Sequence, residues 1–265
     1  DGPYRDKKAY DLLIQSEAAF LSITGTKDEP CKAGNSIADI AAGMYAYTGI
    51  LSALLQRSLT GEGSHVEVSM LEALAEWMGF PMYYAYDGQQ PPGRNGAAHA
   101  TISPYGPFTA GDGKVVMLGL QNEREWKLFC DVVLRRPELA ADPRFDANVR
   151  RTENRAALKE TIEQTFASLT AQEVIARLDE AQIANAAVNQ VGDLWAHPQL
   201  HARQRFRPIG SPAGELQALL PPATVGSFDA RMDPVPALGE HSEAILRELG
   251  RSAADIEQLR AAGVI

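Results

Sequence analysis

The sequence is poor in cysteine: Cys31 and Cys130 are the only two in 265 residues. A lone, widely separated pair has neither metal-binding nor redox-motif spacing, and unpaired thiols are typical of a reducing compartment. The chain also lacks a P-loop, a Gly-x-Gly-x-x-Gly fingerprint, a Gly-x-Ser-x-Gly elbow and internal repeats. We therefore expect no metal site, and a cytoplasmic location, or a mitochondrial one if the source is a eukaryote.

Positive charge is in deficit as well. Lys and Arg total 25 against 34 Asp and Glu, which gives a net charge of −9. This balance argues against a general nucleic-acid surface, although a local basic pocket for phosphates is compatible with it. Hydrophobic residues make up 45% and charged residues 22%, so the chain can bury a large core and form one or two domains.

Only one long apolar stretch is present, and it runs from Ile37 to Leu55. After Asp39 no charged residue appears until Arg57. Ser36 suits the N-cap, and an acidic residue three positions on completes a weak capping-box pattern. A helix that is apolar on nearly every side is buried or spans a membrane. Because the stretch contains a carboxylate and has no second candidate span beside it, we expect a buried helix of a soluble protein.

Asp39 lies in the first turn of this predicted helix and has two interpretations. A helix-start carboxylate is stabilised by the helix dipole by roughly 0.3–1 kcal/mol and needs no chemical role. The same dipole and donors keep a carboxylate ionised at neutral pH, and apolar walls remove its water, which suits a nucleophile. The local pattern leaves both interpretations open.

The remaining pattern predicts alternating helices and short strands. Ser64 to Met70 alternates apolar and polar residues, which predicts a strand with one buried face. Residues 137–155 are polar and predict a surface segment without chemistry, and residues 210–222 are rich in turn formers. Helices are expected over 10–23, 71–86, 121–133, 156–169, 171–181 and 242–250 and from 253 onward, a hairpin over 95–120 and a strand over 183–189.

Several ordered motifs follow one another along the chain. They are Lys8-Ala9-Tyr10-Asp11, Ile23-Thr24-Gly25, Ser36-Ile37-Ala38-Asp39 with Gly43, Thr60-Gly61-Glu62-Gly63, Leu238-Gly239-Glu240-His241-Ser242 and Ala262-Gly263-Val264-Ile265. Together these motifs resemble the family III CoA-transferases, which also include the α-methylacyl-CoA racemases, and the resemblance covers essentially all 265 residues. In that family the aspartate matching Asp39 is the covalent nucleophile, and coenzyme A enters and leaves as a substrate.

The resemblance implies an α/β fold in which both chain ends build a large α/β domain around an inserted small α+β domain. On this template residues 1–86 and 191–265 belong to the large domain, 87–94 form a linker and 95–190 form the small domain. The family assembles as an interlocked homodimer. The abrupt start at Asp1, without an initiator Met, predicts that the chain is the C-terminal portion of a longer protein that contains the rest of the large domain.

The resemblance also implies binding residues. Lys8 and Tyr10 are expected against coenzyme A, where a lysine suits a phosphate and an aromatic ring can cover the adenine or pantetheine. Met70 matches a residue lining the coenzyme A site. By local pattern alone, Lys8 fits a solvated charge run and Met70 fits a core position.

The segment from Arg94 to Tyr105 is similar to its counterpart in family members that act on small dicarboxylates. A dicarboxylic acyl group keeps one free carboxylate, which needs a cation or several donors where water is scarce. Arg94, His99 and Tyr105 are the expected acyl-binding residues, and Arg124 is a further candidate cation. Formyl-CoA transferases of the family close a tetraglycine loop over the acyl group. This chain has Gly96-Ala97-Ala98-His99 at that place. A rigid loop with His99 is the alternative way to protect the acyl group.

Three functions are compatible with this pattern. The racemases of the family use a histidine of a Gly-His-Asp triplet and a second acid, but the matching positions here are Tyr10 and about Asn122. Proton transfer beside a thioester needs bases with a pKa near the working pH, and a tyrosine with a pKa near 10 does not supply one. CoA transfer is therefore favoured, with an acyl-CoA and a small carboxylic acid as partners and neither nucleic acid nor membrane. A non-catalytic module that binds coenzyme A remains the third alternative.

Overall fold

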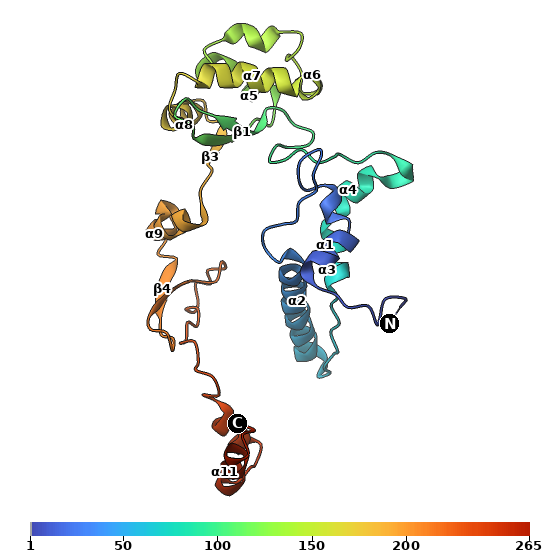
Figure 1. Cartoon of the computed structure of the whole chain (residues 1–265), viewed down its shortest axis with the longest axis vertical. Coiled ribbons are helices and arrows are strands. Elements are labelled where there is room, and N and C mark those ends of the chain that lie inside the picture. Colours follow the sequence, from blue (N-terminus) through green and yellow to red (C-terminus); the bar gives the residue numbers. More distant parts are fainter. Residues whose placement is uncertain (1) are drawn as a thin grey trace. The chain divides into compact units, whose positions relative to one another are not determined.

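The computed structural model describes residues 2–265. The chain divides into two compact units, Asp1–Val188 and Asn189–Ile265. Figure 1 shows the helices and strands of each unit along the chain. The first unit contains a helical part, residues 2–88, and a small three-stranded sheet with its own helices. The assignment of these segments to a large and a small domain stays a prediction.

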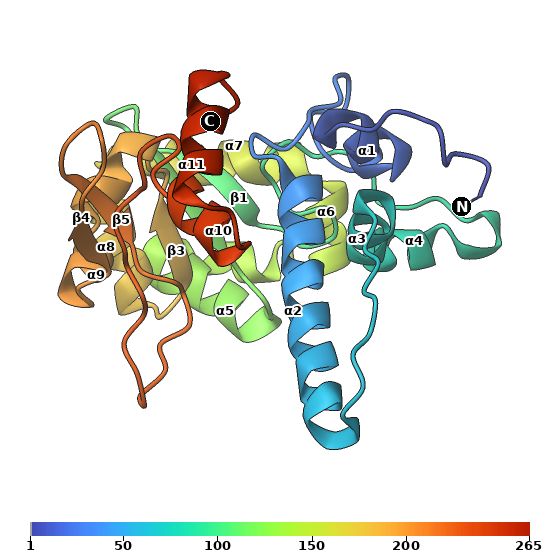
Figure 2. The same cartoon turned by 90° about the horizontal axis from the view of Figure 1, so that it is seen from below.

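The helical part is organised around α2 (Ile37–Thr60), which begins and ends where the sequence predicts. Ser36 takes the N-cap position, and Gly61 ends the helix in the left-handed region at φ 80°, a conformation that glycine adopts without a steric penalty. Figure 2 shows α1 and α3 near the N-terminal end of α2, and both helices contact it. The other elements of this part are α1 (Asp11–Glu17), α3 (Met70–Trp77), α4 (Gly79–Tyr84) and two 3-10 turns (Phe20–Ser22 and Tyr86–Gly88).

The expectation that α2 is buried is wrong for the described residues. Only Ala38 and Ala41 are buried, because α1 and α3 cover just one narrow side of the helix. Among residues 2–265, α2 is also the one helix long and apolar enough to cross a membrane, by length and composition alone. Core helices of soluble proteins pass the same test. Large apolar side chains that stay exposed along α2 are Ile40, Met44, Tyr47, Ile50, Leu51, Leu54, Leu55 and Leu59.

The predicted strand from Ser64 to Met70 is also wrong. The segment from Ser64 to Ser69 has no regular secondary structure, no strand among the described residues pairs with it, and Met70 begins α3. Ser69 has a competing role, since its hydroxyl accepts the Glu72 N–H and caps that helix. The helix expected over 71–86 is interrupted at Met78, between α3 and α4.

The small sheet confirms the predicted hairpin and the strand that follows later in the chain. Strands β1 (Tyr105–Thr109), β2 (Val115–Gly119) and β3 (Ala184–Ala187) are antiparallel in the order β1-β2-β3. Most of the helices between them also lie where they were expected. These are α5 (Glu123–Leu128) with a π-helical extension (Phe129–Val133), α7 (Arg155–Phe166) and α8 (Ala171–Glu180). A 3-10 turn (Pro137–Ala141) and α6 (Asn148–Glu153) lie in the segment that was expected to be a polar surface without helices.

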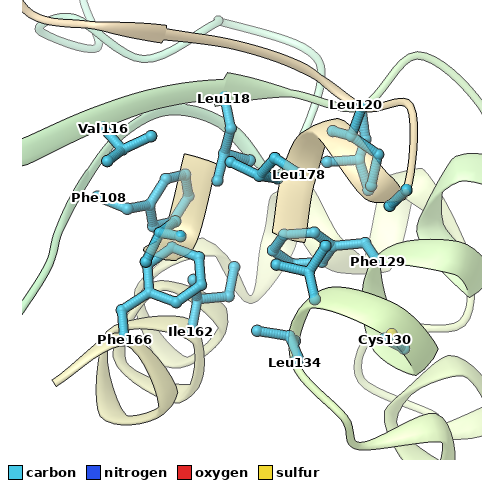
Figure 3. Packing of buried hydrophobic residues seen from close by; sticks show 14 of the residues in the cluster. Phe108, Val116, Leu118, Leu120, Phe129, Cys130, Leu134, Ile162, Phe166 and Leu178 are labelled. Carbon is cyan, nitrogen blue, oxygen red and sulfur yellow. The ribbon is translucent and has the colours of Figure 1, made fainter. Parts of the chain in front are cut away.

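The main core lies between this sheet and its helices, as Figure 3 shows. Val116 and Leu118 are two positions apart on β2, so their side chains point to the same face of the sheet, and both are buried. Ile162 and Phe166 are one helical turn apart on α7 and reach the same cluster. Burying a large apolar side chain contributes about 1.5–3 kcal/mol, so this core gives the loop before β1 a firm support.

The second unit contains a small sheet that the sequence interpretation missed. Strand β4 (Phe206–Ile209) pairs with β5 (Leu216–Leu219), and β5 lies inside the segment expected to be only turns. Gly214, at φ 108°, lies in the loop between the strands. The expected C-terminal helices are present. The helical elements of this unit are a 3-10 turn (Val191–Ala196), α9 (Pro198–Ala202), α10 (Ser242–Glu248) and α11 (Ala253–Ala261).

Candidate active site

Asp39 lies in the first turn of α2, three residues after the N-cap. Its side chain is exposed, and within residues 2–265 it makes neither a hydrogen bond nor an ion pair. The preceding residue, Ala38, is fully buried. The structure therefore presents an unpaired carboxylate at the positive end of a long helix, on a firmly packed backbone, although the apolar walls expected around it are absent from the described residues.

The Ser36 side chain makes no capping hydrogen bond at the start of α2. A side chain of α1 accepts a backbone hydrogen bond there instead. The Ala38 N–H donates to Asp11 Oδ1 over 2.8 Å, and Gln15 Nε2 donates to Asp11 Oδ2 over 2.7 Å. The Ala33 N–H donates to Gln15 Oε1 over 2.9 Å. The sequence interpretation gave Asp11 and Gln15 no role in the site. Their i, i+4 spacing indicates a bond between the two side chains, but it does not connect Asp11 to Ala38.

A cleft of about 1260 Å³ lies between the basic N-terminal segment, α1 and residues 66–72. Lys8 and Met70, two of the three residues expected against coenzyme A, line this cleft. Lys7 also lines it but is paired with Glu17 over 3.0 Å, which raises the pKa of the lysine. Lys8 has no such partner among the described residues. Tyr10, at the N-cap of α1, is 69% exposed and is not part of the cleft lining.

Arg94 is held by the loop that precedes α2. Its Nε donates to the Thr26 carbonyl over 2.9 Å and its NH2 group to the Lys27 carbonyl over 3.1 Å. Beside it, the Gly96 N–H donates to the Gly25 carbonyl over 2.7 Å. These contacts leave the Arg94 NH1 group as the only part of this guanidinium without a partner among the described residues.

His99 organises its own loop. Its Nδ1 accepts hydrogen bonds from the Thr101 and Ile102 N–H groups, at 3.2 and 3.1 Å. A nitrogen that accepts two N–H groups carries no proton, so a neutral ring holds its proton on Nε2. The ring stacks on Tyr105, with the ring centroids 5.1 Å apart and the planes 13° from parallel. The structure thus brings these two expected acyl-binding residues together.

We expect His99→Ala to lower the free energy of unfolding by about 1–3 kcal/mol, because two amides in a half-buried loop lose their acceptor. His99→Asn should lose much less, since an Asn Oδ1 can take the place of the histidine Nδ1. Urea unfolding of the two variants and the wild type measures the difference. Equal losses for Ala and Asn would contradict this role.

The same loop is also held by residues that the sequence interpretation assigned to a polar surface. Arg151 is only 3% exposed, and its Nε donates to the Ser103 carbonyl over 2.8 Å. The Asn148 side chain bonds both the Thr101 carbonyl and the Ser103 N–H. The expectation of a polar surface is wrong at Arg151, because sequence spacing does not show that an arginine is buried.

The Arg151 guanidinium also pairs with Glu123, with an NH2-to-Oε1 distance of 2.8 Å. This hydrogen bond is the main cause that lowers the pKa of the Glu123 carboxyl. Arg155 donates to the carbonyls of His99 and Ala100, so a second arginine fixes the loop backbone. The loop backbone is thus fixed by hydrogen bonds from several side chains. That this loop replaces a tetraglycine loop over the acyl group stays a prediction.

Comparisons with known proteins agree with the motifs. The family model described as CoA-transferase family III matches residues 1–242. A succinate–glutarate CoA-transferase of Agrobacterium fabrum is 29% identical over 94% of this chain and 62% of its own length. A succinyl-CoA:mesaconate CoA-transferase of Haloarcula hispanica is 29% identical over 91% of this chain and 61% of its own length. This chain thus spans about three fifths of the curated relatives it matches.

A solved structure supports the fold. A CaiB/BaiF family protein from Brucella suis is 32% identical, with a TM-score of 0.79 over 94% of this chain and 65% of that one. The mixed helix and sheet architecture described above agrees with this likeness, which confirms the expected α/β fold. On the match over residues 1–242, the chain belongs to CoA-transferase family III.

Proposed function

We propose that the complete protein is a CoA-transferase that moves coenzyme A from succinyl-CoA, or a similar donor, to a small dicarboxylic acid. The observation that carries the proposal is the unpaired Asp39 carboxylate in the first turn of α2. The sequence motifs match this residue to the nucleophile of the family. The two curated relatives described above are named for transfer between succinate and glutarate and for transfer from succinyl-CoA to mesaconate.

The proposed reaction begins when an Asp39 oxygen attacks the donor thioester carbonyl. The C–S bond breaks, CoA leaves as a thiolate, and Asp39 and the acyl group form a mixed anhydride. The thiolate then attacks the Asp39 carbonyl carbon, which releases the donor acid as a carboxylate and leaves an Asp39–CoA thioester. Covalent catalysis of this kind divides one difficult exchange into easier steps.

The acceptor carboxylate next attacks the Asp39 thioester and expels the thiolate, forming a second anhydride. Attack of that thiolate on the acceptor acyl carbon gives the product thioester and regenerates Asp39. Proton transfer and metal ions are not needed in any step. Lys8 and Met70 would contact coenzyme A from the cleft that they line, and Tyr10 would contact it from the edge of that cleft. The loop with His99 and Tyr105 would exclude water from the acyl group.

The alternatives predict different chemistry. A racemase of the same family would exchange the α-proton of a branched acyl-CoA with solvent, and a non-catalytic module would bind coenzyme A without turnover. A coupled assay with succinyl-CoA and a panel of carboxylic acids separates the three. We further propose a cytoplasmic, interlocked homodimer without membrane or nucleic-acid partners. Absence of transfer to every acid tested, by the complete protein, would refute the proposed function.

The dicarboxylate preference has its own expected result: kcat/KM for succinyl-CoA should exceed that for butyryl-CoA by about 10-fold or more. The two donors have similar length and differ by one carboxylate. A site that pairs this group leaves a cation unpaired when butyryl-CoA binds, which costs on the order of 1–3 kcal/mol. Equal use of both donors would rule out the preference.

Two arginines are suited to make this discrimination. Arg124, on α5, makes neither an ion pair nor a hydrogen bond with any residue of 2–265, whereas Arg94 has only its NH1 group available. Arg124→Met and Arg94→Met are therefore compared, and the variant that loses the succinyl preference identifies the acyl-carboxylate contact. Arg144→Met, which removes an exposed pair with Asp142, serves as the matched control.

A further inference from the structure

We infer that Asp11, held by Gln15, is the positioning residue that aims the Asp39 carboxylate at the thioester. This inference rests on the proposed function, in which Asp39 is the nucleophile. At the start of α2 the Ser36 side chain makes no capping hydrogen bond, and the Asp11 carboxylate of α1 accepts the Ala38 N–H instead.

The geometry connects Asp11 to the nucleophile through one peptide unit. Asp11 Oδ1 accepts the Ala38 N–H, and Ala38 is fully buried against Ile14 and Leu74. Asp39 is the next residue, so the direction of its Cα–Cβ bond follows the orientation of the backbone that Asp11 holds. Asp39 itself has no side-chain partner among the described residues, so the backbone alone sets where its carboxylate can reach.

Gln15 fixes the orientation of the Asp11 carboxylate. It is fully buried, donates to Asp11 Oδ2 and accepts the Ala33 N–H from the loop before α2. Both Asp11 oxygens are therefore engaged, and the Gln15 amide can have only one orientation. Rotating that amide would place its NH2 group against the Ala33 N–H, which is also a donor.

This arrangement predicts an effect on the chemical step and little effect on binding. A misplacement of about 1 Å in a reacting group can cost roughly 10²-fold in rate. Asp11 is absent from the residues that line the cleft between the N-terminal segment, α1 and residues 66–72, whereas Lys8 and Met70 are part of that lining. Loss of Asp11 should therefore lower kcat and leave KM for the acyl-CoA nearly unchanged.

The test uses a single and a double substitution, which separate the loss of the hydrogen bond between residues 11 and 15 from the loss of the negative charge at position 11. Asp11→Asn keeps the shape and the acceptor for the Ala38 N–H, but its NH2 group faces the NH2 group of Gln15. The double variant Asp11→Asn/Gln15→Glu restores every bond, because the carboxylate introduced at position 15 accepts from both the new amide at position 11 and the Ala33 N–H. The negative charge then lies one helical turn further along α1.

In the complete protein, we expect Asp11→Asn to lower kcat by roughly 10²-fold with KM within about two-fold. The double variant should regain kcat to within about five-fold of the wild type. Wild-type kcat in Asp11→Asn, or a double variant as slow as the single one, would overturn the positioning role in an enzyme that transfers CoA.

Amide hydrogen exchange in the first turn of α2 gives a readout that does not need turnover. Faster exchange in Asp11→Asn with recovery in the double variant supports the hold on α2, and unchanged exchange in Asp11→Asn overturns it. Absence of CoA transfer by the wild type would instead refute the proposed function, so the two failures are distinguishable.

Discussion

Asp39→Ala should abolish CoA transfer in the complete protein, with a loss in kcat of roughly 10³- to 10⁶-fold, while the fold is retained. Removing a covalent nucleophile has effects of this size, because the remaining binding groups cannot replace the intermediate it forms. Little stability should be lost, since the Asp39 side chain is exposed and has no partner in the described part of the chain. A CoA-transfer assay measures the first effect, and urea unfolding checks the second.

The covalent step is observable directly. After incubation with succinyl-CoA, hydroxylamine should convert Asp39 of the wild type to a hydroxamate, which mass spectrometry of the peptide detects. No modification is expected without the acyl-CoA. Modification of another carboxylate, with Asp39 unchanged, would show that Asp39 is not the nucleophile.

Asp255→Ala is the matched control for the helix-start interpretation of Asp39. Asp255 occupies the same third position in α11, where it completes a capping box with Ser252. A carboxylate that only supports a helix end contributes about 0.5–2 kcal/mol to stability and nothing to turnover. We therefore expect Asp255→Ala to transfer CoA at the wild-type rate. Normal transfer by Asp39→Ala as well would return Asp39 to the helix-start role.

The sequence predicts most of the helices and the hairpin, because their periodicity and end signals are local. The span of α2 follows from its uncharged run and from Gly61, and the hairpin follows from the turn before Val115. The strand expected at Ser64 to Met70 fails for a physical reason. Alternation describes an extended backbone but does not supply a partner strand, and the Ser69 cap belongs to the next helix.

The candidate site could be predicted only in part. Family motifs predict Asp39, Lys8 and Met70 as site residues, and the last two do line one cleft. The supports of the site could not be predicted, because they join residues far apart in the chain: Asp11 with Ala38, and Arg151 with Ser103. Spacing within one helix carries no signal for a hydrogen bond across 27 or 48 residues.

Arg151→Met should be strongly destabilising, lowering the free energy of unfolding by about 2–4 kcal/mol. Arg151 is the most buried charged residue among those described, and its guanidinium donates to two backbone carbonyls, those of Ser103 and Phe145. Each buried acceptor that loses its donor costs about 1–3 kcal/mol. Urea unfolding measures the loss, and Arg151→Lys, which keeps the charge without the planar fork, should fall between Met and the wild type.

Arg150→Met is the control one residue earlier. Arg150 forms an exposed pair with Asp146 at 2.9 Å, and such surface pairs contribute about 0–1 kcal/mol. The same chemical change should therefore cost much less at position 150 than at 151. Similar losses at both positions would contradict the assignment of Arg151 as the buried support of the loop before β1.

The ion pair between Glu123 and Arg151 should make the stability of the protein depend on pH. The Arg151 guanidinium lowers the pKa of Glu123 below its ordinary value of about 4.5. Because the folded state binds that proton less readily, the ion pair stabilises the protein above the unfolded pKa and loses this contribution as pH falls through the folded value. The difference in unfolding free energy between the wild type and Glu123→Gln should thus be constant from about pH 7 to pH 5.5 and shrink below about pH 4.5. A difference that stays constant down to pH 3 would show that the charge of Glu123 does not support Arg151, and that the two backbone carbonyls alone hold it.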